Sequence, residues 1–77
     1  MTEAYEIAME VVRSGALPMR LAQHSLWANY KACQRGNCAQ TKRHAREMIY
    51  WISKHHPLNV VRETAEGMLR IIDRSRH

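Results

Sequence analysis

Residues 38–54 have the sequence CAQTKRHAREMIYWISK, and residues 55–57, which follow, read HHP. At about 100° of rotation per residue, the apolar side chains of the longer segment gather on one side of a helix. Pro57 cannot continue a helix, because it has no N–H and its ring clashes with the preceding turn. We therefore predict an amphipathic helix over 38–54. Its core stripe comprises Cys38, Ala45, Met48, Ile49 and Ile52, opposed by Arg43, Glu47, Tyr50 and Lys54.

The other predicted helices follow from the few positions that interrupt the chain. The sequence has only three Gly and two Pro, the residue types that most often end helices or form turns. Gly15 ends a first helix, Pro18 suits the first turn of a second, and Gly36 ends that second helix. We predict an all-α fold, a compact bundle of about four helices over residues 3–14, 18–35, 38–54 and 58–74.

Length and composition limit the function. Seventy-seven residues suffice for one domain, residues 1–77, which buries only about 60–65% of its unfolded surface and has little room for a catalytic cleft. No nucleophile with a base and an orienting group stands out, so we expect no enzymatic activity, no catalytic residues and no cofactor. The five His and two Cys do not match zinc-site spacings. We therefore expect no metal site and interpret Cys33 and Cys38 as core residues.

The start of the chain and its hydropathy bear on location. No apolar run approaches the about 20 residues that span a bilayer. The opening Met1-Thr2-Glu3 is acidic, whereas a signal peptide begins with basic residues. We therefore expect a cytoplasmic protein with no membrane among its partners.

The charges are unevenly distributed along the chain. The net charge of +5 combines an acidic start, residues 1–12, with residues 13–46, which carry seven bases and no acid. A block of one sign is either an anion-binding surface or a solvated face that an acidic helix neutralises. Both interpretations stay open, the second through Glu3, Glu6 and Glu10.

The second predicted helix gathers bases and a Trp within an arc of about 80°. Trp and Arg are enriched at protein interfaces, whereas Lys and Arg also bind phosphates and an exposed Trp stacks on bases. Three interpretations stay open: an acidic protein partner, DNA or RNA, or a Trp that folds onto a neighbouring helix among solvated bases. The set, which we call the basic-aromatic face, comprises Arg20, His24, Trp27, Lys31 and Arg35, with Lys42, Arg43, Arg46 and Tyr50 of the third helix as an expected extension.

Two helices joined at Gly36 also have the order of a helix-turn-helix DNA reader. Ala32 fits the small-residue position of that motif, but Lys31 and Lys42 fall where it has buried apolar side chains. An unpaired buried charge is very unfavourable. The sequence therefore disfavours major-groove reading and leaves mainly phosphate contacts for a nucleic-acid partner.

The last predicted helix has a second apolar stripe beside its core stripe. This stripe comprises Val60, Thr64, Gly67 and Ile71, spaced 4-3-4 along the helix. A helix with two apolar sides needs two partners. It is therefore either buried centrally in the bundle or paired with a second copy of the chain, which makes the stripe a candidate homodimer seam.

These patterns favour a binding protein over an enzyme. We expect a small non-enzymatic regulatory or adaptor protein, such as a phage- or plasmid-type accessory modulator or inhibitor, that binds an acidic protein surface through the basic-aromatic face. The alternative is a nucleic-acid-binding protein that makes mainly phosphate contacts through the same face.

Overall fold

The computed structural model describes residues 2–36 and 38–74. These residues form four helices, α1 (Thr2–Arg13), α2 (Met19–Arg35), α3 (Ala39–His55) and α4 (Asn59–Arg74). The predicted all-α bundle of about four helices is confirmed, and every predicted boundary lies within one residue of the observed one. Of the four, none combines the length and hydropathy that a membrane crossing requires.

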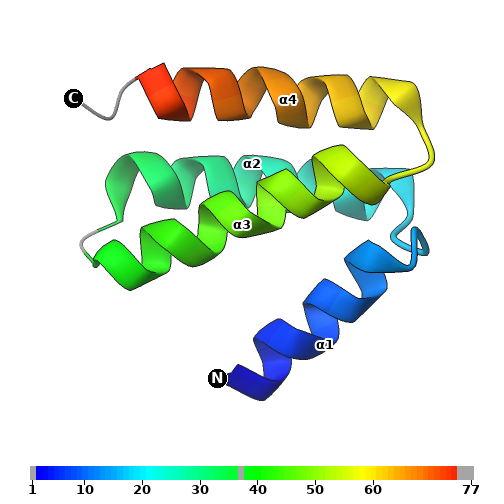
Figure 1. Ribbon diagram of the computed structural model, residues 1–77, viewed down its shortest axis with the longest axis horizontal. Helices are drawn as coiled ribbons and strands as arrows, with labels where there is room; N and C mark the ends of the chain where they lie inside the picture. Colours follow the sequence, from blue (N-terminus) through cyan, green and yellow to red (C-terminus); the bar gives the residue numbers. More distant parts are fainter. Residues whose placement is uncertain (1, 37, 75–77) are drawn as a thin grey trace.

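α3 is the central helix of the bundle (Figure 1). It packs against each of the other three helices, and α2 also packs against α4. α2 and α4 run in the same direction and α3 runs opposite to them, whereas α1 leaves the bundle at an angle (Figure 1). Among the described residues, α1 packs on α3 and on no other helix.

Burial follows the predicted stripe of α3 except at its first residue. Ala45, Met48, Ile49 and Ile52 are all buried on α3, as the spacing predicts. Burying each large aliphatic side chain contributes about 1.5–3 kcal/mol, so this stripe stabilises the packing of α3. The core comprises Met9, Val12, Ala22, Leu26, Met48, Ile49, Ile52, Val61, Ala65, Met68 and Ile72.

Cys38 does not belong to the core, and its assignment to the α3 stripe was wrong. The side chain is exposed, whereas that of Cys33 is half-buried and packs against the core. α3 begins only at Ala39, and Cys38 is its N-cap residue in an extended conformation. A residue before the first helical turn does not follow the helical periodicity, so its side chain leaves the stripe.

The side chain of His56 joins the α1–α2 connection to the α3–α4 connection at one end of the bundle. The ring is buried, and the residue is the C-cap of α3. Its Nδ1 atom accepts a hydrogen bond from the Leu58 N–H at 3.2 Å. Nε2 therefore carries the proton, and it donates to the Leu17 carbonyl at 2.8 Å. One side chain thus links the segment before α2 to the segment before α4.

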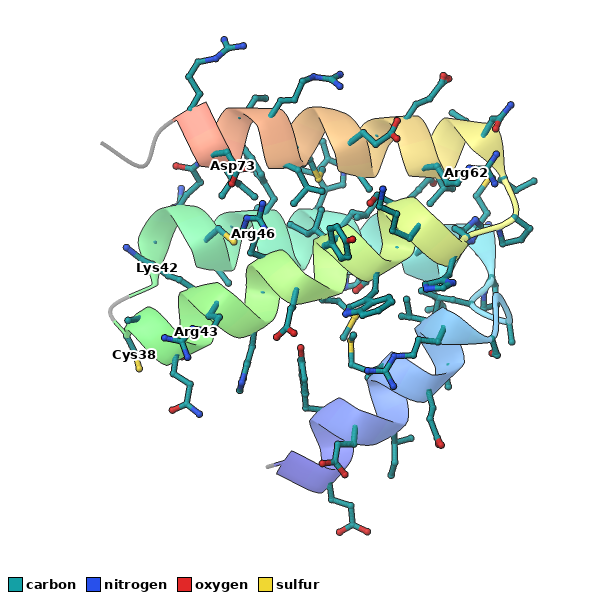
Figure 2. The ribbon with its side chains drawn as sticks, viewed as in Figure 1. Cys38, Lys42, Arg43, Arg46, Arg62 and Asp73 are labelled. Atoms are coloured by element: carbon teal, nitrogen blue, oxygen red, sulfur yellow. The ribbon has the colours of Figure 1, made fainter. Side chains whose placement is uncertain are left out.

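Gly15 allows these connections to approach closely. Its φ of +74° lies in the left-handed region, which glycine adopts without steric cost. A Cβ atom at this position would lie 3.3 Å from the His55 carbonyl oxygen. Arg62 reinforces the same junction, because its guanidinium donates to the His56 carbonyl at 2.6 Å and to the side chain of Asn59 (Figure 2).

Contacts to aromatic rings hold α1 on α3, on either side of the buried Met9 and Val12. The Tyr5 ring stacks on His44 with centroids 4.5 Å apart, and its hydroxyl donates to Glu47 at 3.2 Å. Burial first, and then the Glu47 charge, raise the pKa of Tyr5. At the other end of α1, the Arg13 guanidinium lies 5.0 Å from the centre of the Trp51 ring.

We expect His56→Ala to lower the free energy of unfolding by about 1–3 kcal/mol, because it removes both hydrogen bonds of a buried side chain. Urea unfolding followed by far-UV circular dichroism measures the change. His24→Ala is the matched control, because His24 is exposed. Equal unfolding midpoints for the two variants would show that His56 does not hold the connections together.

Candidate functional site

α2 presents the basic-aromatic face to solvent. Its buried residues, Ala22 and Leu26, lie on the opposite side of the helix. Trp27 is 56% exposed and meets the ring of Tyr30 edge-on, with centroids 5.9 Å apart. Trp27 therefore does not fold onto a neighbouring helix. All five members are exposed, Arg20, His24, Trp27, Lys31 and Arg35, and the first and last are about 22 Å apart along the helix axis.

The bases of this face have no acidic partner within residues 2–36 and 38–74. The ion pair found there joins Arg46 to Asp73, and it involves no residue of α2. Glu3, Glu6 and Glu10 lie on α1, which does not contact α2. Neutralisation of the basic block by the acidic first helix is therefore not seen within this part of the chain.

In the expected extension on α3, Arg46 and Tyr50 are engaged in contacts within the fold. Arg46 donates from Nε and Nη2 to the two carboxylate oxygens of Asp73, at 2.9 and 2.8 Å (Figure 2). This hydrogen bonding raises the pKa of Arg46. Tyr50 packs edge-on against Trp51, with ring centroids 5.5 Å apart. The Lys54 ammonium lies 5.5 Å from the centroid of the Tyr50 ring.

A pocket of about 500 Å³ lies where the C-terminal ends of α2 and α4 meet the first turns of α3. None of the five α2 members of the basic-aromatic face lines it, whereas three bases of the expected α3 extension do. The lining residues are Cys33, Gln34, Ala39, Lys42, Arg43, Arg46 and Ile72. Sequence periodicity gave no indication of this pocket, because its volume depends on where three helices end in space.

The second stripe of α4 faces solvent. Val60 and Ile71 are 55% and 46% exposed, and the exposed Thr64 donates its hydroxyl to the Val60 carbonyl at 2.8 Å. A Cβ atom at Gly67 would meet the Arg70 guanidinium at 3.9 Å, an ordinary van der Waals distance. The interpretation of α4 as a centrally buried helix was therefore wrong, and the homodimer seam stays a prediction.

Metal ligands do not cluster in the described ranges, because no three His, Cys, Asp or Glu side chains there could share an ion. Compared with protein-family models, curated proteins and solved structures, the chain matches none of them. The function therefore has to be inferred from the chemistry and shape of the surface.

The two cysteines differ in environment. The backbone N–H groups of Thr41 and then Gln40 lower the pKa of Cys38, although its side chain makes no formal capping hydrogen bond. Burial raises the pKa of Cys33, more than the nearby charges of Arg46 and Lys42 lower it. Because the thiolate is the nucleophile, the two thiols should react at different rates.

We expect Cys38 to react at neutral pH at least about tenfold faster than Cys33 with an aromatic disulfide reagent that releases a coloured thiol. Stopped-flow absorbance resolves the two phases. Cys38→Ser should remove the fast phase and Cys33→Ser should retain it. A fast phase that survives in Cys38→Ser would contradict the assignment.

Proposed function

We propose that this chain is a non-enzymatic regulatory or adaptor protein that binds an acidic protein surface through the basic-aromatic face. Trp27 carries this proposal. More than half of its side chain is exposed, so the fold gains little of the stabilisation that a buried Trp provides. Its position among bases with no acidic partner in the described chain is explained by a partner that covers the ring.

The face combines an anchor with a complementary charge. Trp and Arg are the side chains most often found as binding hot spots. Lys and Arg around a buried aromatic ring add electrostatic complementarity, which speeds association and selects an acidic partner. α2 therefore supplies Trp27 as the central contact, with Arg20, Lys31 and Arg35 as the charged surroundings.

The size of the face indicates a modest interface. A strip about 22 Å long and about 10 Å wide is smaller than the about 800 Å² per partner of a stable complex. A contact of this size is typical of transient, regulatory association. The mechanism we propose is occupancy, in which the chain covers an acidic surface and blocks or bridges what else binds there.

Nucleic acid is the alternative partner for the same face. Its phosphates would pair with the bases, and Trp27 would stack on an unpaired base. Single-strand binders usually combine several stacking rings with a groove. Trp27 is the aromatic residue among the five α2 members of this face, and the neighbouring Tyr30 meets it edge-on. This geometry favours the protein partner.

We expect affinity purification from the native host to recover a partner with the wild-type chain and to lose it with Trp27→Ala. The ring is exposed, so its removal should leave the fold intact. Binding should also fall with Arg20→Ala/Lys31→Ala, because both changes remove charge from the face. Quantitative mass spectrometry of the captured material, with and without nuclease treatment, measures the loss.

Arg70→Ala/Arg74→Ala on α4 is the matched control, because it removes the same charge from another exposed surface. Capture of the same partner by this control and by nuclease-treated samples supports a protein partner. Loss of the partner upon nuclease treatment supports the nucleic-acid alternative. Equal recovery with wild type and Trp27→Ala would refute a role for the face.

We further propose that the second stripe of α4 is a homodimer seam. The exposed Val60 and Ile71 lie at its two ends, with Thr64 and Gly67 between them. A second copy would remove both aliphatic side chains from water. Gly67 at the centre has no side chain, so another backbone can approach closely there.

We expect Gly67→Leu to convert a dimer into a monomer without destabilising the fold. The site has space for a Cβ atom, and replacing a Gly within a helix adds up to about 1 kcal/mol of helix stability. Sedimentation equilibrium at several concentrations measures the mass. Glu66→Leu, on a different side of α4, should leave the dimer intact. A monomeric wild-type chain at every concentration would exclude the seam.

A further inference from the structure

The pocket at the start of α3 has an excess of positive charge. Lys42, Arg43 and Arg46 line it, and Asp73 pairs with Arg46. No carboxylate within the described residues forms an ion pair with Lys42 or Arg43. Glu47 lies one turn beyond Arg43 but instead accepts the hydroxyl of Tyr5. The local charge is therefore about +2 once the Arg46–Asp73 pair is counted as neutral.

The position of Lys42 is unfavourable for the helix itself. Lys42 lies in the first turn of α3, which carries no acid and where the helix dipole disfavours cations. The like charge four residues further along, Arg46, is compensated by Asp73, whereas Lys42 has no such partner within the described residues. A bound anion would relieve this effect.

Neighbouring residues hold the pocket walls in place. The Cys33 thiol donates to the Lys42 carbonyl at 3.7 Å. A Cβ atom at Gly36 would lie 3.1 Å from Lys42 Cγ, so the missing side chain makes room for the lysine stem. Arg46 is fixed by its two hydrogen bonds to Asp73 (Figure 2). Burial raises the pKa of Cys33, so its thiol stays neutral and does not balance the bases.

The volume and lining identify the class of ligand. About 500 Å³ lies within the range of about 300–1,000 Å³ that small-molecule sites occupy. Lys and Arg are the usual partners of phosphate, and two unpaired cations match the two charges of a phosphate monoester. We propose that this pocket binds a phosphate dianion, either free or carried by a small molecule, through Lys42 and Arg43. Gln34 and Ile72 would contact the organic part of a phosphorylated ligand.

This site is separate from the α2 residues of the proposed macromolecular interface. Its lining includes none of the five α2 members of the basic-aromatic face, and it is concave where they form the outer side of one helix. Trp27→Ala should therefore bind phosphate as the wild-type chain does. The phosphate site and the partner-binding face can each fail without the other.

Titration at low ionic strength, followed by amide chemical shifts in heteronuclear NMR, tests the site with inorganic phosphate, glycerol phosphate and glycerol. We expect saturable shifts around Ala39, Lys42 and Arg43 with both phosphates and none with glycerol. Lys42→Ala/Arg43→Ala should weaken phosphate binding at least about tenfold, because it removes both charge-assisted contacts. Tighter binding of glycerol phosphate identifies a phosphorylated small molecule as ligand, and equal binding identifies free phosphate.

Arg70→Ala/Arg74→Ala lowers the net charge equally and should change the affinity less than about twofold. Arg43→Gln, at a single exposed position, provides a second variant whose dispersed spectrum verifies folding. Equal weakening by the α4 control, shifts spread over all basic residues, or no saturable shift with either phosphate would overturn the site.

Discussion

Everything in this fold depends on α3 having three sides to cover. α1, α2 and α4 each pack against it, and within residues 2–36 and 38–74 no further helix covers their outer sides. Each surrounding helix therefore buries one side and leaves the opposite side to solvent. The exposure of Trp27 on α2 and of Val60 on α4 follows from this arrangement, and it is the reason why we propose binding surfaces on these two helices.

The same arrangement separates the charges. Glu3, Glu6 and Glu10 lie on α1, which packs on α3 alone among the described helices, and they form no ion pair with the bases of α2 within the described residues. Arg46 finds Asp73 instead, on a helix 27 residues further along the chain. The acids of α1 therefore lie on one side of α3, and bases without an ion-pair partner among the described residues lie on α2 and on the first turn of α3. A field of one sign over these elements attracts anionic partners.

Local features predicted the fold well. Gly15, Gly36 and Pro57 act on the backbone next to them, so they mark where helices end. The stripe of Met48, Ile49 and Ile52 follows the helical repeat of about 3.6 residues. Features that depend on the number or placement of neighbours were not predictable. Periodicity assigned Cys38 to the core, yet the residue precedes the first helical turn. Two apolar stripes on α4 suggested central burial, yet the bundle covers only one of them. The pocket beside Lys42 exists only because three helix ends meet there.

Shape distinguishes the two basic surfaces more than chemistry does. The outer side of α2 is convex, so its bases can contact a broad macromolecular surface but cannot surround a small ion. The pocket is concave, and Lys42 and Arg43 both line it. The two surfaces nevertheless share α2, since Gln34 lines the pocket and Arg35 belongs to the face. Adjacent residues lie within the Debye length of about 8–10 Å, so an anion in the pocket would lower the positive potential at the C-terminal end of the face and weaken its attraction for an acidic partner.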